Sequence, residues 1–322
     1  MDTLEKIAEQ LKTAKSVGIF THVRPDGDAY GSALALALAL DKLSIPNYVC
    51  NESEPPSNLT FLEGLDRVQK TPPFEADVLI ALDSSDGTRL GTLSDVFLMA
   101  KNKRKITLNV DHHISNTRFA TLNYVKECAA NCINVFRLLS YMGMPIDKKT
   151  AQYLMVGLLT DSGNFSHDDV DEETFLVAAE LVKAGADVNG LTYELFRKQP
   201  RARAALHSEV TAKTRYYFDG MFAAIVITRE AHEKCGADIG MTEGLVDFPL
   251  SVDTVEVAAA LLEMKKGQYK ISLRSKRYAD ANGIARTYGG GGHIRAAGCM
   301  LFGEIEEILD KLTYTVSQYL ED

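Results

Sequence analysis

Cysteine is sparse in this 322-residue sequence, and no two of its five cysteines form a C-x-x-C pair. The absence of such pairs excludes a standard zinc knuckle and suits a reducing compartment. Long apolar runs are also lacking, because the longest, around residues 32–40, is far shorter than the ~20 residues that a membrane span needs. The first stretch, MDTLEKIAEQLKTAK, contains no hydrophobic signal region. We therefore expect a cytoplasmic protein with no membrane partner.

Basic residues are outnumbered by acidic ones. The sequence has 35 Lys and Arg against 44 Asp and Glu, and its formal net charge is −9. Proteins that bind long nucleic acids need many Lys and Arg contacts along the phosphate backbone, and no basic run in this sequence supplies them. We therefore expect no long duplex nucleic acid as a partner. A phosphate-bearing ligand should be small and held by local cations.

The first half of the sequence alternates strand-like and helix-like segments. A chain of this length exceeds the size at which one hydrophobic core usually keeps growing, which favours two domains. Near-continuous Val, Ile and Leu runs, typical of strands buried on both faces of a parallel sheet, occupy residues 16–22, 76–83 and 105–113. Helical patterns occupy residues 4–14, 33–43 and 132–143. The alternation predicts an α/β domain with a doubly wound, mainly parallel sheet.

A different order of elements follows in the second half. Residues 171–206 have a helical pattern, with acidic residues in its first turn and Gly185 at the end of its first part. A strand at 221–228 comes next, and then two strands joined by KKG, which predict a hairpin. A glycine-rich patch and a C-terminal helix from about Glu304 complete a second, smaller α/β domain. The predicted limits are 1–186 for the first domain, 187–206 for a helical linker and 207–322 for the second domain.

Polar residues that can bind metal follow each of the three predicted strands. The first strand ends at His22 and runs on into Asp26 and Asp28; the second ends at Asp83; the third ends at Asp111, His112 and His113. In open parallel sheets, ligands bind outside the carboxyl ends of the strands. We therefore expect these residues to converge, although they are far apart in the sequence.

Asp161, in the stretch GLLTDSGNF, is a fourth candidate, and it follows the helical apolar run AQYLMVGLL. Taken alone, Asp161 is more often a helix-end or turn residue. The same holds for Asp83 at the end of a strand, and His22 alone is an ordinary polar residue. Three strands that all end in this way favour a shared site.

The converged set offers at least four carboxylates and two imidazoles, with no thiolate. Close carboxylates raise one another's pKa values, so such a cluster needs divalent cations to stay ionised. Oxygen-rich ligands with some imidazole suit Mn²⁺ or Mg²⁺ better than structural zinc, although Fe, Co or Zn can occupy such sites. This ligand set is large enough for two metals about 3.5–4 Å apart that share a bridging carboxylate, an arrangement used for in-line phosphoryl displacement. The sequence therefore predicts phosphate ester hydrolysis by two-metal activation of water.

Four motifs, HVRPDGDAYGS, ALDSSD, DHH at 111–113 and GLLTDSGNF, resemble in the same order the motifs of the DHH phosphoesterases. The stretch YGGGGHIRAAG, at 288–298, resembles the signature of the DHHA1 domain that accompanies one branch of the family. The chain length and the motifs are similar to those of oligoribonucleases (nanoRNases) that also dephosphorylate 3′-phosphoadenosine 5′-phosphate (pAp). The resemblance implies hydrolysis of short oligonucleotides to mononucleotides, of pAp to AMP, or of both. It also implies two Mn²⁺ ions, with Mg²⁺ or Co²⁺ as alternatives.

The resemblance also implies a role for each motif residue. His22, Asp26 and Asp83 serve one metal; Asp28, Asp83, His112 and Asp161 serve the other, so that Asp83 bridges the two. Asp111 orients a histidine, and His113 faces the scissile phosphate. The implied catalytic residues are His113, Asp83 and Asp111.

The glycine-rich patch has two interpretations. GGGGH lacks the Lys-Ser/Thr of a P-loop, so it predicts no nucleoside triphosphate site and can be a flexible surface loop. Alternatively, consecutive glycines let backbone N–H groups approach an anion closely. In that case, the second domain would hold a substrate phosphate or base edge, and Arg295 is at least as well explained as a solvated side chain. The predicted substrate-binding residues are His113, Arg274, Gly290, Gly291, Gly292 and His293.

Other functions remain open. The pyrophosphatase branch shares the DHH domain, but its second domain differs from the glycine-rich one found here. Hydrolysis of cyclic or linear dinucleotides, cyclic di-AMP or pApA, is the main alternative, and a nucleotide sensor without turnover is a third possibility. The expected partners are short oligonucleotides or small nucleotides. The resemblance further implies a homodimer through the first domain, and the apolar helix at 132–143 is either its contact or part of the core.

Overall fold

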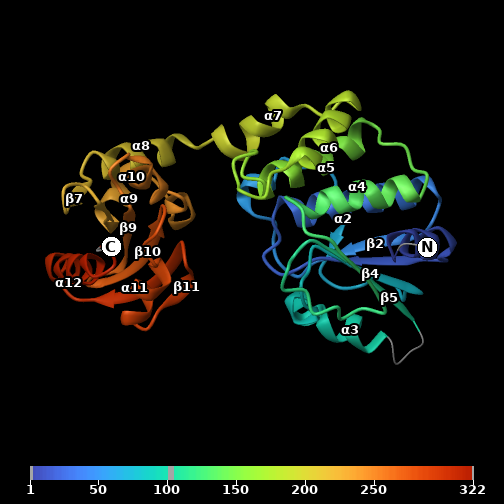
Figure 1. The fold of residues 1–322 in the computed structure, drawn as a ribbon, viewed down its shortest axis with the longest axis horizontal. Helices are drawn as coiled ribbons and strands as arrows, with labels where there is room; N and C mark the ends of the chain where they lie inside the picture. The colour runs from blue at the N-terminus through green and yellow to red at the C-terminus, as the bar shows by residue number, and fades with distance from the viewer. Residues whose placement is uncertain (1–2, 101–104, 321–322) are drawn as a thin grey trace. The chain divides into compact units, whose positions relative to one another are not determined.

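The first half of the chain forms a sheet of six parallel strands (Figure 1). The computed structural model describes residues 3–100 and 105–320. In the order β3-β2-β1-β4-β5-β6, the strands are β3 (Val68–Gln69), β2 (Asn47–Cys50), β1 (Val17–Phe20), β4 (Val78–Leu82), β5 (Ile106–Asp111) and β6 (Leu122–Val125). The apolar runs of β1 and β4 are buried on both faces, as their lack of alternation requires. The predicted doubly wound α/β fold is confirmed.

The strands predicted at 16–22, 76–83 and 105–113 are β1, β4 and β5. The sequence does not predict β2, β3 and β6. Strand β3 has only two residues, and β2 and β6, with four residues like β1, each contain an asparagine that shortens the apolar run typical of a buried strand. Strand β6 is also only half-buried along its length.

Helices cover both faces of this sheet (Figure 1). On one face lie α1 (Thr3–Thr13), α2 (Gly27–Lys42) and α4 (Asn131–Tyr141). Helices α5 (Lys148–Asp161) and α6 (Glu172–Lys183) pack over α2 and α4. On the other face, α3 (Ser94–Leu98) contributes Phe97 to a smaller cluster around Phe20 and Tyr48. Short 3-10 helices lie at Ser57–Leu59, Leu65–Arg67 and Gly87–Leu93.

Helix α2 begins at Gly27, six residues before the predicted start at 33. The reason is Asp26, whose side chain accepts hydrogen bonds from the backbone amides of Asp28 and Ala29, both at 3.0 Å. An aspartate in this position satisfies amides that the first turn of a helix leaves without partners. The motif HVRPDGDAYGS is therefore both the loop after β1 and the first turns of α2.

Helices α2 and α5 approach each other closely because glycine lies on both of them. A Cβ at Gly31 would lie 2.4 Å from the carbonyl oxygen of Tyr153, and a Cβ at Gly27 would lie 2.5 Å from Thr160 Oγ1. On α5, Gly157 faces Asp28 in the same way. The close approach brings the end of α5, at Asp161, to the start of α2.

The helical pattern at 171–206 is interrupted rather than continuous. After α6, Gly185 adopts a left-handed φ of +103°, and α7 (Val188–Thr192), a π-helical turn (Tyr193–Arg197) and α8 (Arg201–Thr211) follow. The chain divides between Lys198 and Gln199 into two compact units, inside the segment 187–206 that the sequence predicts as a linker. Leu191 and Leu195 belong to the core of the first unit.

The second unit is a smaller, mixed sheet with helices on its faces, as predicted (Figure 1). In the order β11-β12-β10-β9-β8-β7, its strands are β11 (Gly291–His293), β12 (Ala296–Phe302), β10 (Gln268–Ser275), β9 (Val257–Lys265), β8 (Phe222–Ile227) and β7 (Arg215–Tyr217). Its other helices are α9 (Arg229–Cys235), α10 (Asp247–Ser251), α11 (Ala281–Thr287), α12 (Ile305–Ser317) and a 3-10 helix, Ile239–Thr242. The predicted hairpin is the antiparallel pair β9 and β10. Within residues 3–100 and 105–320, no helix has both the length and the apolar character needed to cross a membrane.

Candidate metal centre

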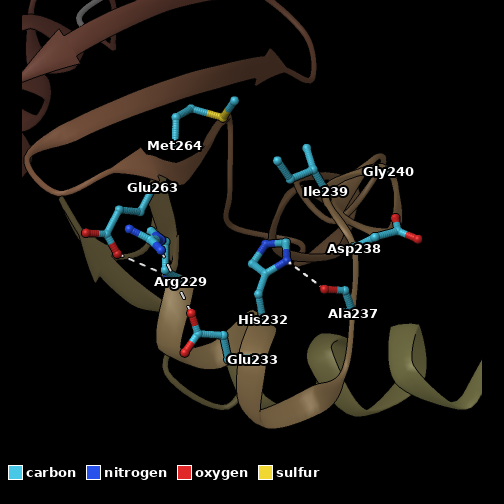
Figure 2. Close-up of a pocket in the computed structure, with 9 residues that line it drawn as sticks. All are labelled: Arg229, His232, Glu233, Ala237, Asp238, Ile239, Gly240, Glu263 and Met264. Atoms are coloured by element: carbon cyan, nitrogen blue, oxygen red, sulfur yellow. Dashed lines mark hydrogen bonds and ion pairs between the residues drawn. The ribbon is translucent and has the colours of Figure 1, made fainter.

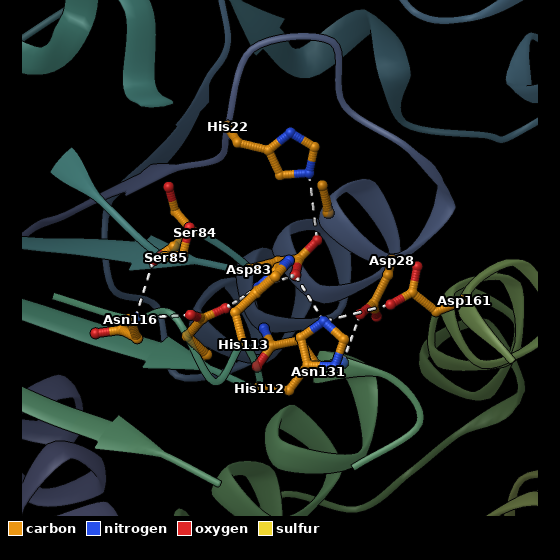
Figure 3. Close-up of polar contacts among 12 residues, drawn as sticks. His22, Asp28, Asp83, Ser84, Ser85, His112, His113, Asn116, Asn131 and Asp161 are labelled. Carbon is orange, nitrogen blue, oxygen red and sulfur yellow. Dashed lines mark hydrogen bonds and ion pairs between the residues drawn. The ribbon is translucent and has the colours of Figure 1, made fainter. Parts of the chain in front are cut away.

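Three strand ends of the first sheet meet at one point of its edge. In its strand order, the connections change direction between β1 and β4, and sheets of this kind bind ligands outside the carboxyl ends of the strands at that point. His22 follows β1, Asp83 follows β4 and His112 follows β5. Figure 3 shows His22 and His112 on either side of Asp83. The predicted convergence of these strand ends is thus present in the structure.

His22 and Asp26 face each other across the start of α2. The Nδ1–H of His22 donates to the carbonyl of Val23 at 3.0 Å, so Nε2 faces Asp83 Oδ2 at 3.4 Å and Asp26 Oδ2 at 3.8 Å. Burial acts to lower the pKa of His22, but the neighbouring carboxylate of Asp83 outweighs it and raises this pKa. Asp26 uses its other oxygen, Oδ1, as the cap of α2.

Asp28 is fully buried at the first turn of α2 and is held by the first turn of α4. The backbone amides of Asn131 and Cys132 both donate to its carboxylate, the second of them at 2.8 Å. A helix N-terminus favours a negative charge. Burial and the charge of Asp83 act in the opposite direction and raise the pKa of Asp28 to about 7.

Asp83 lies at the centre of the site, where its two oxygens face different imidazoles. Oδ2 faces His22 Nε2, and Oδ1 faces His112 Nε2 at 3.3 Å. Burial acts to raise the pKa of Asp83, but the two histidines hold it below its usual range. Its backbone has a φ of +53°, a strained conformation of the kind that is retained at functional sites. A carboxylate in this position is placed to serve two cations.

His112 and Asp161 complete the cluster from β5 and α5. The Nδ1–H of His112 donates to the carbonyl of Cys128 at 2.9 Å, which leaves Nε2 3.3 Å from Asp161 Oδ2. Burial opposes protonation of His112, but Asp83 and Asp28 raise its pKa to about 11. Burial, Asp28 and Asp83 raise the pKa of Asp161 to about 10.

Asp111 orients His113 rather than His112. Its Oδ1 accepts from the Nδ1–H of His113 at 2.8 Å, and its Oδ2 accepts from Asn116 Nδ2 at 2.6 Å. Asp111 is fully buried at the end of β5, whereas the His113 side chain is 31% exposed. The ring of His113 is therefore fixed through one nitrogen, while its other nitrogen, Nε2, remains for a ligand.

The residues fit a pair of divalent cations. Groups of side chains whose ligand atoms lie within 4.8 Å of one another are His22, Asp26 and Asp83; Asp28, His112 and Asp161; and Asp83, Asp111, His112 and His113. Asp83 Oδ1 and His112 Nε2 are buried and face each other, yet neither has a hydrogen-bond partner among the described residues. A cation coordinated by both would satisfy both atoms, and it would also keep the crowded carboxylates ionised.

Two thiols lie beside this cluster, but their chemistry does not suit metal binding. Burial raises the pKa of Cys128 to about 12, and burial with the charge of Asp28 raises that of Cys132 well above its usual value. Both therefore remain protonated thiols at neutral pH. The donor set consists of carboxylate oxygens and imidazole nitrogens, which favours Mn²⁺ or Mg²⁺ over thiolate-bound metals.

Several supporting residues are absent from the sequence prediction. The start of α4 at Asn131 holds Asp28, and Asn116 holds Asp111. Asn51 holds the loop that carries His22, because its Nδ2 donates to the carbonyl of His22 at 2.8 Å. The helical pattern at 132–143 predicts α4 but not what its first amides bind. The only sequence feature that could have indicated the role of Asn116 is its position three residues after the DHH motif.

The predicted substrate-binding residues of the second unit lie on its β10-β12-β11 edge. Ala296 of β12 pairs with Arg274 of β10 on one side and with His293 of β11 on the other. Directly paired residues share a face of the sheet, so Arg274 and His293 flank the small side chain of Ala296. Arg274 Nε lies 3.9 Å from Asp247 Oδ1, and His293 is exposed.

The glycines of this edge serve the close approach of β11 and β12. A Cβ at Gly290 would lie 2.2 Å from the carbonyl oxygen of Gly298, and Gly292 has a φ of +154°. The amide of Gly290 donates to the carbonyl of Ala285, and that of Gly292 donates to Asn282 Oδ1. These two amides therefore already have partners, as does Arg274, whose Nη1 donates to the carbonyl of Leu273 at 3.0 Å.

A pocket of about 560 Å³ lies elsewhere in the second unit, beside α9 (Figure 2). Its charged groups pair with one another, because the Arg229 side chain lies 3.9 Å from Glu233 and the Arg229 amide donates to Glu263 at 3.0 Å. His232 Nδ1–H donates to the carbonyl of Ala237 at 3.2 Å. This pocket contains none of the predicted site residues.

Comparisons with known proteins agree with this geometry. The family model "DHH family, N-terminal domain" matches residues 16–158, and the "DHHA1 domain" matches residues 222–322. A curated relative from Thermus thermophilus, "Bifunctional oligoribonuclease and PAP phosphatase NrnA", is 32% identical over 99% of this chain and 95% of its own. A relative of the same name from Bacillus subtilis is 26% identical over 90% of this chain and 91% of its own. The crystal structure of an exopolyphosphatase-related protein from Bacteroides fragilis has a TM-score of 0.86 and 27% identity, covering 98% of this chain and 96% of that one.

Proposed function

Because the chain belongs to the DHH phosphoesterase family and carries a DHHA1 domain, we propose that it hydrolyses short oligonucleotides to mononucleotides, pAp to AMP, or both. The names of its relatives from Thermus thermophilus and Bacillus subtilis support this substrate class, since the chain matches both over nine tenths of their length or more. The observation that carries the proposal is the convergence of the candidate metal ligands around Asp83.

The proposed cofactor is a pair of Mn²⁺ ions, with Mg²⁺ or Co²⁺ as alternatives. His22, Asp26 and Asp83 would hold one ion; Asp28, Asp83, His112 and Asp161 would hold the other. A pair of such ions supplies activation of water and stabilisation of the phosphate charge. The oxygen-rich donor set and the unpartnered atoms of Asp83 and His112 support this assignment.

Hydrogen bonds from the remaining polar groups of the site fix the orientation of these side chains. The carbonyls of Val23 and Cys128 accept from Nδ1 of His22 and His112, which fixes the tautomer that presents an unprotonated Nε2 to a metal. The amides at the start of α4 orient Asp28 in the same manner. Asp111 orients His113, which we assign to face the scissile phosphate.

In the second domain, we assign Arg274 and His293 to a substrate phosphate or base edge, with Gly290, Gly291 and Gly292 shaping the strand beside them. A cytoplasmic homodimer also belongs to the proposal. The burial of the apolar face of α4 in the core of the first unit supports the core interpretation of this helix. The dimer therefore rests on the family resemblance, and sedimentation tests it.

The decisive experiment is a hydrolysis assay with Mn²⁺ across pAp, pApA, RNA of two to five nucleotides, cyclic di-AMP and pyrophosphate. We expect turnover of pAp and short RNA that a chelator abolishes and that Asp83→Asn lowers by about 10³-fold or more, as the loss of a central metal ligand should. Asp86→Asn is the matched control, because it changes a carboxylate of the same loop outside the three ligand groups. Loss of activity in both variants would indicate a disturbed loop rather than a metal site.

The same panel decides between the alternatives. Preference for pApA or cyclic di-AMP over pAp and short RNA would replace the proposed substrate by dinucleotides. Saturable nucleotide binding without any product would refute the proposed hydrolytic activity and indicate a nucleotide sensor.

A further inference from the structure

A second pocket, of about 350 Å³, lies on the same edge of the first sheet as the metal centre. Its walls come from the loop after β2, from the residues around β3 and from α2, and they include Asn51, Ser53, Glu54, Lys70 and Tyr30. Since β1 to β5 are parallel, the carboxyl ends of β2 and β3 lie at the same edge as those of β1 and β4. Neighbouring strands are only about 4.8 Å apart, so the pocket and the metal centre are adjacent.

Two residues that line the pocket hold the loop between β1 and α2, which carries the metal ligands His22 and Asp26. Asn51 Nδ2 donates to the carbonyl of His22 at 2.8 Å, and Ser53 Oγ accepts from the amide of Arg24 at 2.9 Å. Tyr30 lies two residues after Asp28 on α2. The loop and first turns of α2 therefore carry metal ligands and one residue of the pocket, Tyr30.

The pocket wall contains a buried hydroxyl with no partner. Tyr30 is fully buried, and among the described residues nothing forms a hydrogen bond with its hydroxyl. Tyr30 and Glu54 both line the pocket. By contrast, the hydroxyl of Tyr288 donates to the carbonyl of Lys311 at 2.7 Å. An unpaired buried hydroxyl costs free energy, and a bound ligand would remove that cost.

The charges around the pocket indicate what kind of group it accepts. Two carboxylates, Glu54 and Asp66, line it against one cation, Lys70, which already pairs with Glu54. This balance disfavours a phosphate. Hydroxyl and carboxylate groups beside the apolar surfaces of Leu65 and Val68 instead suit a flat ring with polar edges.

We propose that this pocket receives the nucleoside part of a nucleotide whose phosphate lies at the metal centre, and that the Tyr30 hydroxyl binds the polar edge of its base. This inference rests on the proposed function, because it supplies the part of substrate recognition that the metal centre lacks. Tyr30 and Glu54 then determine preference for nucleotides over phosphate esters without a base.

The first test compares Tyr30→Phe with the wild type on pAp and on bis(p-nitrophenyl) phosphate, a diester without a base. The loss of one hydrogen bond should raise KM for pAp by about 3- to 10-fold with kcat nearly unchanged, and should leave the base-free diester unaffected. Tyr48→Phe is the matched control, because Tyr48 is also buried but packs in the cluster on the other face of the sheet. An equal loss on both substrates, or no loss on either, would overturn the inference.

The second test separates this inference from the proposed function. Adenosine has no phosphate, so its binding, measured by NMR titration of the full chain, does not depend on hydrolysis. We expect Tyr30→Phe and Glu54→Ala to weaken adenosine binding by about 3-fold or more. Glu54 is exposed, so its replacement leaves the fold intact. Unchanged adenosine binding in both variants, with pAp still hydrolysed by the wild type, would refute nucleoside binding in this pocket but not the proposed function. Weakened adenosine binding in the variants, with no pAp hydrolysis by the wild type, would refute the proposed function and support nucleoside binding in this pocket.

Discussion

Replacing Gly157 with alanine should disturb the metal centre from a position that binds no metal. A Cβ at Gly157 would lie 2.2 Å from Cys132 Sγ, 2.6 Å from Asp28 Oδ1 and 2.9 Å from Asp28 Cα. All three distances are shorter than real Cβ contacts. The Asp28 Cα belongs to the backbone of α2, so it cannot rotate away as a flexible side chain would.

Two opposing terms set the size of the effect. Alanine in place of glycine in a helix interior stabilises the folded state by about 0.5–1 kcal/mol. Overpacking a well-packed core costs about 1–3 kcal/mol, and here the overlap includes backbone. We therefore expect a net loss of about 1–2 kcal/mol, which lowers the unfolding midpoint by roughly 2–8 °C at about 2–4 °C per kcal/mol. Displacement of Asp28 should also weaken Mn²⁺ binding.

Thermal unfolding without metal and calorimetric titration with Mn²⁺ measure the two effects separately. Gly240→Ala is the control, because Gly240 also has an ordinary φ and a Cβ there would lie 3.2 Å from its nearest neighbour, Asp238 Oδ1. Cys132→Ala combined with Gly157→Ala removes the closest overlap but not the one with Asp28, so it should restore stability more than Mn²⁺ affinity. The reasoning is refuted if Gly157→Ala is as stable as the wild type and binds Mn²⁺ equally well.

Four further predictions follow from individual residues. Because the pKa values of Asp28, Asp161 and His112 are raised to about 7, 10 and 11, Mn²⁺ must displace protons from all three at lower pH, so Mn²⁺ affinity should rise by at least about tenfold per pH unit from pH 5 to 7; an affinity independent of pH would contradict this. The raised pKa of Asp28 also means that its contribution to the stability of the metal-free fold is largest below the unfolded value of 3.8 and is lost as pH rises to 7, which urea unfolding of the wild type against Asp28→Asn measures. Asn116→Ala removes the 2.6 Å hydrogen bond that holds Asp111, so kcat for pAp should fall about 10-fold or more while Mn²⁺ affinity stays near that of the wild type, whereas equal loss of both would contradict a role through His113. Asp171→Ala removes the capping box of α6 and should cost about 0.5–2 kcal/mol in urea unfolding without changing kcat; a change in kcat would indicate a link to the site.

The sequence predicts the strand ends of the site because the physical signal there is strong. The buried strands β1 and β4 have unbroken apolar runs, and β5 is mainly apolar with buried Thr107 and Asn109 between its apolar residues. A chargeable residue lies at or just after the end of each, where a parallel sheet binds its ligands. No comparable signal marks β2, β3 or β6, whose few residues pair with neighbours that are distant in sequence. The pairing that defines these short strands is a property of the folded sheet rather than of the local sequence.

The supporting contacts of the site are the least predictable part. The amides of Asn131 and Cys132 that hold Asp28 are backbone groups, so no side-chain pattern reports them. The carbonyls of Val23 and Cys128, which orient the two histidines, are invisible to sequence analysis for the same reason. The glycine-rich patch shows the opposite problem, because its sequence suggests free backbone amides that the structure does not have. The amides of Gly290 and Gly292 already donate hydrogen bonds within the second unit.

Asp26 and Asp28, two residues apart, end in different parts of the site because a helix begins between them. Asp26 is the cap, with an extended φ of −104°, and its Oδ2 turns back toward His22 and β1. Asp28 is already in the first turn, where the helical rotation of about 100° per residue directs it toward α4 and α5 instead. Gly27 between them has no side chain, and a Cβ there would meet Thr160 on α5. The start of one helix therefore separates two like charges into two ligand groups, and Asp83 opposite them is the one carboxylate that faces a histidine of each group.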